Sequence, residues 1–144
     1  MQLTLKTDYA LRILMALAST DDVLSVDWLA VHYGISRNHL AKVAQALTAA
    51  QLVVTTRGRS GGMRLARPPA EINVGFVVRS FERFEGFVDC MGGEERCVIE
   101  GACGLKPALG GALEAFLSHL DRFTLADIAR RSDAIRNRLL QVVP

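Results

Sequence analysis

The chain has 144 residues, half of them hydrophobic and only 6% aromatic. This length suits one domain with an extension, and the aliphatic, alanine-rich composition favours helices. No apolar run approaches the ~20 residues of a membrane span. The polar residues Lys6, Thr7 and Asp8 interrupt the N-terminal pattern that a signal peptide would need. We therefore expect a cytoplasmic protein, in which clustered thiols stay reduced.

The net charge of +2 is unevenly distributed along the chain. Residues 1–70 carry eight Lys/Arg against four Asp/Glu, a balance of +4, whereas residues 71–144 carry nine against eleven, a balance of −2. A basic N-terminal half is typical of a surface that meets a polyanion, although ordinary surface charge can give the same balance.

The first 50 residues predict three helices, and the last two resemble a helix-turn-helix. The first is expected over residues 3–18, where small polar Thr7 and Asp8 would cap its start. Its apolar stripe is formed by Tyr9, Ile13, Leu14 and Leu17. A second, short helix is expected over residues 25–33, ended by Gly34 in a left-handed turn. The third is expected over residues 37–50, with Ser36 as its N-cap.

A β-hairpin is expected directly after the third helix. Residues 52–56 and 63–67 are β-like runs, and the glycine-rich segment 57–62 joins them. The fold class is therefore mainly α with a small β-hairpin wing, a winged helix-turn-helix. Arginines on the wing suit a narrow minor groove, while a plain solvated hairpin is the alternative. These arginines are Arg57, Arg59, Arg64 and Arg67.

The start of the third helix is expected to read the major groove. Arg37, Asn38 and His39 would reach base edges, Lys42 would contact phosphate, and Ser36 precedes them. The wing residues Arg57, Arg59 and Arg64 would read minor-groove shape or bind phosphate.

The second half predicts a short helix over residues 74–84 and a longer one from about Pro107 to Phe123. The longer helix carries a broad apolar stripe, which is expected either to form a dimer or to pack on its own domain. The stripe comprises Leu109, Leu113, Phe116, Leu117 and Leu120. Thr124 is expected to cap one last helix, and the arginine-rich tail that follows is expected to be solvated.

The three cysteines of the chain, Cys90, Cys97 and Cys103, lie within fourteen residues. Their C-x6-C-x5-C spacing lacks the close pairs common in structural zinc sites, and no histidine lies among them. Three clustered thiols instead indicate a metal or iron–sulfur centre that needs a fourth ligand, with free thiols as the alternative. That ligand could be a small molecule or a carboxylate. The candidate carboxylates are Asp8, Asp89, Glu94, Glu95 and Glu100.

Several long segments resemble one known family. The chain is similar to the iron–sulfur winged-helix transcription regulators, and within that family to the members that sense nitric oxide. The resemblance covers most of the chain. The matching segments are LTLKTDYALRILMALA, GISRNHLAKVAQAL, TRGRSGGMRLARPPAEI, the three-cysteine loop and FTLADI.

The resemblance implies a homodimer that holds a 4Fe–4S cluster, a 2Fe–2S cluster being less favoured. Cys90, Cys97 and Cys103 would be ligands, Asp8 would complete the site from the partner subunit, and Arg12 would hold that carboxylate. Another branch of the family has a histidine ligand for a 2Fe–2S cluster at the position of Lys106. The chain departs from its relatives in the first cysteine interval, which is longer than is common.

The resemblance further implies a repressor that releases double-stranded operator DNA when nitric oxide nitrosylates the cluster. One alternative is a regulator that senses iron or redox status. Another is a cluster- or thiol-dependent enzyme, which the absence of a Cys–His pair, a phosphate loop or paired acid/base residues disfavours. The resulting organisation is a winged helix-turn-helix domain at 1–70, a connecting helix and cluster-binding loop at 71–104, and a dimerisation helix with a C-terminal helix at 105–144.

Overall fold

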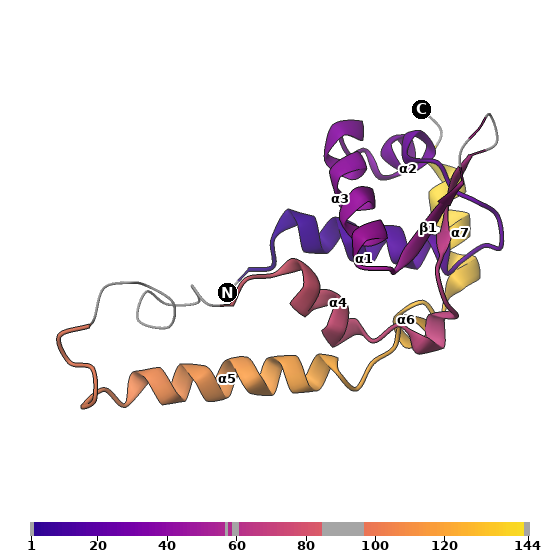
Figure 1. The fold of residues 1–144 in the computed structure, drawn as a ribbon. Helices are drawn as coiled ribbons and strands as arrows, with labels where there is room; N and C mark the ends of the chain where they lie inside the picture. Colours follow the sequence, from indigo (N-terminus) through magenta and orange to yellow (C-terminus); the bar gives the residue numbers. More distant parts are fainter. Residues whose placement is uncertain (1, 57, 59–60, 85–96, 143–144) are drawn as a thin grey trace.

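A computed structural model describes residues 2–56, 58, 61–84 and 97–142 (Figure 1). The described part is mainly helical with one two-stranded antiparallel hairpin, so the expected fold class is confirmed. In chain order the elements are α1 (Leu5–Leu17), α2 (Val26–Tyr33), α3 (Arg37–Ala49), β1 (Val53–Thr56), β2 (Gly62–Leu65), a 3₁₀ turn (Pro69–Glu71), α4 (Val74–Phe81), α5 (Leu105–Leu120), α6 (Leu125–Ile128) and α7 (Ser132–Gln141).

Helix α1 begins at Leu5, before the two residues that were expected to cap it. Its N-cap is Thr4, which has extended backbone angles and whose Oγ1 accepts a 3.3 Å hydrogen bond from the Thr7 amide. Thr7 and Asp8 are already helical at that point, so the prediction that they cap the helix is wrong. An N-cap residue must have non-helical backbone angles, which Thr4 alone of the three has.

Helices α2 and α3 form the expected helix-turn-helix. Ser25 caps α2 by accepting a 3.0 Å bond from the Trp28 amide, and Gly34 ends it with φ at +63°. Glycine takes this left-handed conformation without a steric cost. Ser36 precedes α3 as expected, but its side chain makes no capping hydrogen bond.

The hairpin pairs Val53 with Leu65 and Thr56 with Gly62, so its strands are shorter than expected. Leu24, in the loop before α2, adds to its edge: the Met63 amide donates to the Leu24 carbonyl at 2.8 Å, and the Leu24 amide donates back at 3.0 Å. A Cβ atom on Gly62 would lie 2.8 Å from the Leu24 carbonyl oxygen, so this close approach needs glycine.

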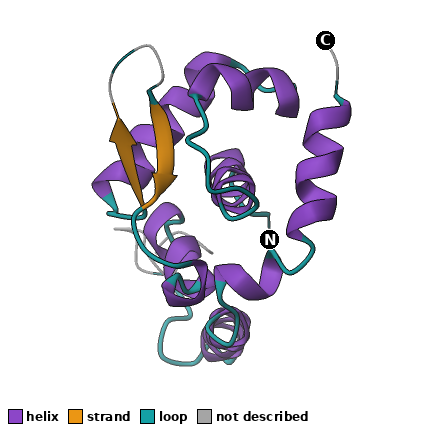
Figure 2. Ribbon diagram, turned by 90° about the vertical axis from the view of Figure 1, so that its right-hand side faces the viewer, coloured by secondary structure: helices purple, strands orange, loops and turns teal. Residues whose placement is uncertain are grey.

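Helix α1 lies at the centre of the core and packs against α3, α4, α7 and the hairpin. Figure 2 shows the hairpin on one side of the helices and α7, which leads to the C-terminus, on the other. The predicted apolar faces of α1 and α3 are inside, as are residues of α2 and β1. The fully enclosed side chains include Ile13, Leu14, Leu29, Leu40, Leu47 and Val53.

Helix α5 begins at Leu105 rather than at Pro107 and ends at Leu120. Proline is tolerated in the first helical turn because the amide it lacks has no partner inside the helix there. The end of α5 is fastened to α4: Arg79 and Asp121 form an ion pair that includes a 2.7 Å bond from Nη2 to Oδ2. The Asn73 Nδ2 atom also donates to the Asp121 carbonyl at 2.7 Å.

The single final helix that was expected is two helices. Thr124 and Asp127 form a reciprocal capping box at α6, which ends at Ile128, and α7 begins at Ser132. Helix α7 packs on α1 and α2 through a buried Leu139, so the C-terminal segment is folded. Its arginines are exposed, as expected for a solvated face. No described helix is both long and apolar enough to cross a membrane.

Candidate nucleic-acid interface and cysteine site

The first turn of α3 presents polar side chains to solvent. Ser36, Arg37, Asn38 and His39 are all exposed, and so is Lys42 one turn later. They are exposed because the buried face of α3 lies elsewhere, at Leu40, Val43, Ala44 and Leu47. The structure therefore brings the five expected DNA-contacting residues of this helix to one exposed end.

The wing lies beside this helix. An open groove of about 520 Å³ separates α3 from the start of α2 and from the hairpin, and its walls include Thr55, Thr56 and Gln45. Arg64 of β2 is exposed, as a phosphate contact requires. Arg67 is instead held against its own chain, because its Nη2 donates to the Gln51 carbonyl at 3.2 Å. The predicted contacts Arg57 and Arg59 lie outside the described residues.

The groove also holds a contact that the sequence did not predict. Asp27, in the first turn of α2, forms an ion pair with Arg37, the first residue of α3. The bond joins Arg37 Nε to Asp27 Oδ1. Ten residues separate the pair, a spacing that carries no helical signal, because the intervening turn sets their approach.

Two of the three cysteines converge. Cys97 is exposed and Cys103 is half-buried, and both line one pocket of about 350 Å³ just before and at the start of α5. Cys90 lies outside the described residues. Soft thiols at one pocket fit an iron–sulfur centre or another soft metal. Within the described residues, no three His, Cys, Asp or Glu side chains gather closely enough to hold a metal ion.

Asp8 and Arg12 face each other one turn apart on α1. Arg12 Nε donates to Asp8 Oδ1 at 3.1 Å, and Nη2 lies 2.9 Å from Oδ2. The Tyr33 hydroxyl donates to the Arg12 carbonyl at 2.9 Å, and burial raises the pKa of Tyr33 to about 12. The expected Arg12–Asp8 contact is therefore present in the free chain, and both side chains remain about 40% exposed.

The structure does not bring Asp8 to the described cysteines of its own chain. Figure 1 shows the start of α1 against the body of the molecule and the start of α5 at the far end of a projecting helix. Of the other candidate carboxylates, Glu100 pairs with Lys106 at 2.9 Å, while Asp89, Glu94 and Glu95 lie outside the described residues.

The histidines make contacts of other kinds. His32 stacks on Trp28 with ring centroids 3.8 Å apart, and its Nδ1 lies 2.7 Å from the Trp28 carbonyl. His119 on α5 packs against Phe123. Neither lines the pocket that holds the two described cysteines.

A second contact missed from the sequence fastens the start of α1 to the end of α4. Glu82 Oε1 accepts a 2.7 Å bond from the Thr4 amide and a 3.0 Å bond from the Thr4 hydroxyl. Burial opposes ionisation of Glu82, but these bonds and one from Thr7 outweigh it and lower its pKa. Seventy-eight residues separate the partners, so no local pattern could reveal the contact.

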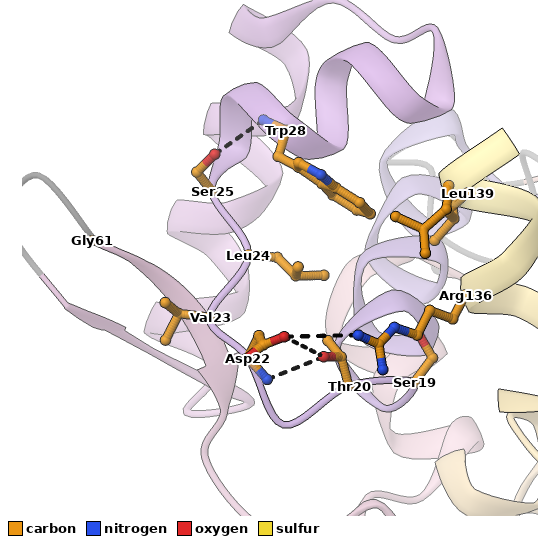
Figure 3. A pocket seen from close by; sticks show the side chains of 11 residues that line it. Ser19, Thr20, Asp22, Val23, Leu24, Ser25, Trp28, Gly61, Arg136 and Leu139 are labelled. Carbon is orange, nitrogen blue, oxygen red and sulfur yellow. Dashed lines mark hydrogen bonds and ion pairs between the residues drawn. The ribbon is translucent and has the colours of Figure 1, made fainter. Parts of the chain in front are cut away.

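Another pocket, of about 530 Å³, lies between α2, α7 and the loop after α1 (Figure 3). Trp28 and Leu139 face into it from opposite sides, and Arg136 lies 3.9 Å from Asp22 at its edge. It exists because α7 returns to the N-terminal helices, which the sequence did not predict.

Comparison with known proteins identifies the family. Residues 3–131 match Rrf2, described as an iron-dependent transcriptional regulator. The HTH-type transcriptional regulator NsrR of Bacillus licheniformis is 43% identical over 142 residues, which cover 96% of this chain and 99% of that protein. The regulator of the same name from Halalkalibacterium halodurans is 42% identical, with 100% of both chains covered.

Among solved structures, T. potens IscR superimposes with a TM-score of 0.71 at 25% identity, covering 92% of this chain and 88% of that one. These relatives are named as regulators, so the expectation of a regulator rather than an enzyme is confirmed. The winged-helix fold and the family resemblance inferred from the sequence are confirmed as well. The chain belongs to the Rrf2 family of iron-dependent transcriptional regulators.

Proposed function

We propose that the protein is a dimeric DNA-binding repressor that holds a 4Fe–4S cluster and releases its operator in response to nitric oxide. The observation that carries the proposal is the placement of Cys97 and Cys103 on one pocket at the end of a projecting helix. The identity to regulators named NsrR over nearly the whole chain supports the same conclusion.

The proposed ligands are Cys90, Cys97 and Cys103 of one chain and Asp8 of the partner subunit. When bound, such a cluster supplies iron that reacts with nitric oxide. The donor set suits it, because thiolates are strong ligands for iron–sulfur clusters and a carboxylate is a weaker, more labile one. Arg12 orients the Asp8 carboxylate through two contacts, and the exposure of Asp8 leaves it accessible to a second chain.

Helix α5 supports the proposed dimer. Of its predicted apolar stripe, only Leu117 is buried within the chain, whereas Leu109, Leu113, Phe116 and Leu120 are partly exposed. Leu105, at the start of the same helix, is 63% exposed. A helix that leaves such a stripe uncovered is typical of one that packs against a second copy.

The dimer would place two α3 helices in successive major grooves, roughly 34 Å apart. Arg37, Asn38 and His39 would face base edges, and Lys42 and the wing arginines would contact the backbone. Helix α1 packs on α3 and is fastened through Thr4 to Glu82 at the end of α4. Binding of Asp8 to the cluster of the partner subunit would therefore influence the positions of α1 and α3.

Binding to operator DNA without oxygen, with and without nitric oxide, tests the proposal. We expect a brown protein that binds a near-palindromic operator and releases it when nitric oxide is added. A colourless protein that contains zinc would exclude the cluster, and unchanged binding in nitric oxide would exclude the proposed signal. The description of the family as iron-dependent favours one second candidate, a regulator that senses iron status. Release by an iron chelator but not by nitric oxide would support that candidate.

A further inference from the structure

We propose that Asp27 is a positioning residue that holds Arg37 ready to read one guanine of the operator. The inference rests on the proposed DNA-binding function and adds a specificity role at the helix-turn-helix. It starts from the Asp27–Arg37 ion pair in the groove between α2, α3 and the wing.

The atoms used by the pair leave the reading edge of the arginine available. Asp27 accepts from Nε of Arg37, and within the described residues this is the one hydrogen bond that the guanidinium makes. The two terminal nitrogens make no hydrogen bond within the described residues, so the end-on edge that they form is available. Those nitrogens bind O6 and N7 of guanine bidentately in the major groove, the commonest specific contact of arginine with DNA.

The pair has little to contribute to folding. Both side chains are about two-thirds exposed, 63% for Arg37 and 66% for Asp27, and exposed ion pairs add little stability. A positive charge at the first residue of a helix also faces the positive end of the helix dipole. Asp27 offsets that repulsion and restricts the rotamers of a long, flexible side chain, so less entropy is lost when Arg37 meets a base.

Asp27 also acts against binding elsewhere on DNA. It lies in the same groove as Arg37, Thr55 and Thr56, where the phosphate backbone would approach. A carboxylate there repels phosphates, so it weakens non-specific binding, which is almost wholly electrostatic. Loss of Asp27 is thus expected to strengthen non-specific binding while weakening discrimination between bases. A merely structural residue would lower both.

The test uses the full-length protein purified without oxygen. A duplex selected by this protein from a random library is substituted at each base pair in turn, and the loss of affinity is measured for wild type, Arg37→Ala and Asp27→Asn. Arg37→Ala is expected to abolish discrimination of roughly 5- to 150-fold at one G·C pair in each half-site. Asp27→Asn should reduce discrimination several-fold at that same pair and raise affinity for an unrelated duplex.

Two controls separate the inference from simpler effects. Asp21→Asn removes the same charge from an exposed position of the loop before α2 and should leave discrimination unchanged. Adding Asp27→Asn to Arg37→Ala should cause no further loss at the G·C pair, because the positioned group is already gone.

Unchanged discrimination in Asp27→Asn, or an equal loss at every base pair, would overturn the inference while the wild-type protein still bound its selected duplex. Failure of wild type to select any duplex would overturn the proposed function, and the inference with it. The two failures are therefore distinguishable in a single set of measurements.

Discussion

The winged-helix unit, formed by α1–α3, the hairpin and α7, contrasts with the cysteine arm, formed by residues 97–104 and α5. In the unit, Ile13, Leu14 and Leu47 have no solvent-exposed surface. In the arm, Val98 is fully exposed, Leu105 is 63% exposed, and Leu117 is the one described α5 residue that is buried. The unit thus has a core closed within one chain, whereas the arm carries apolar and thiol side chains that remain wholly or partly exposed in the described part of the chain.

This difference suggests a division of roles. A core that closes on itself gives α3 and the hairpin fixed positions, which reading DNA requires. The arm, in contrast, would be completed only by a second chain. The distance between the two winged-helix units of a dimer would then depend on the contact that joins each arm to the other chain. The predicted division at 1–70, 71–104 and 105–144 stays a proposal. Helix α7, which belongs to the third of these segments, packs on α1 and α2 of the first.

The largest effect is expected from a cavity in the winged-helix unit. Leu47→Ala removes a side chain with no exposed surface, so it should lower the free energy of unfolding by about 2–5 kcal/mol. Urea unfolding followed by circular dichroism would measure it. The matched control is Leu140→Ala on α7, where Leu140 is 54% exposed and the expected change is within about 0.5 kcal/mol. Equal losses for the two variants would contradict the core described here.

A charge on the arm is expected to separate the subunits while leaving each one folded. Leu113→Glu would bury an unpaired carboxylate in the proposed interface, which should weaken association on the order of 100-fold. Sedimentation velocity over a concentration series would measure this, with circular dichroism to show that the helices persist. Ser118→Glu, an exposed position on the opposite side of α5, serves as the control. A Leu113→Glu protein that remains as dimeric as wild type would remove α5 from the interface.

The joint between the two regions is expected to give the smallest, pH-dependent effect. At the start of α6, the Thr124 amide, Arg130 and the Thr124 hydroxyl together lower the pKa of Asp127 from 3.8 to about 2. A carboxyl group whose pKa is lower in the folded than in the unfolded state stabilises the fold at pH values above the unfolded-state pKa. That stabilisation is lost as the pH falls through the folded-state pKa. Wild type should therefore exceed Asp127→Asn in stability above about pH 4, and the two should converge toward pH 2. Urea midpoints that differ by a constant amount across this range would contradict the assignment.

The sequence anticipates the features that local chemistry decides. Gly34 ends α2, Thr124 caps α6, and the buried faces of α1 and α3 follow from their helical spacing. It fails where a distant partner decides. Thr4 rather than Thr7 caps α1, where Glu82 also binds it, and the turn before α3 brings Asp27 to Arg37. The cysteine spacing predicts thiols at one place, but nothing local could say that Asp8 lies away from Cys97 and Cys103 in its own chain (Figure 1).

In the proposed dimer, α1 of one chain completes the arm of the other. The direct measurement is the visible spectrum, taken without oxygen, of a mixed dimer of one Asp8→Ala chain and one Cys103→Ala chain, purified through two different tags. If Asp8 acts across the dimer, one site in each mixed dimer keeps all its ligands, and about half of the wild-type spectrum and of its nitric oxide response should return. If Asp8 acts within its own chain, neither site is complete, and a spectrum no closer to wild type than that of the Asp8→Ala homodimer would contradict the claim.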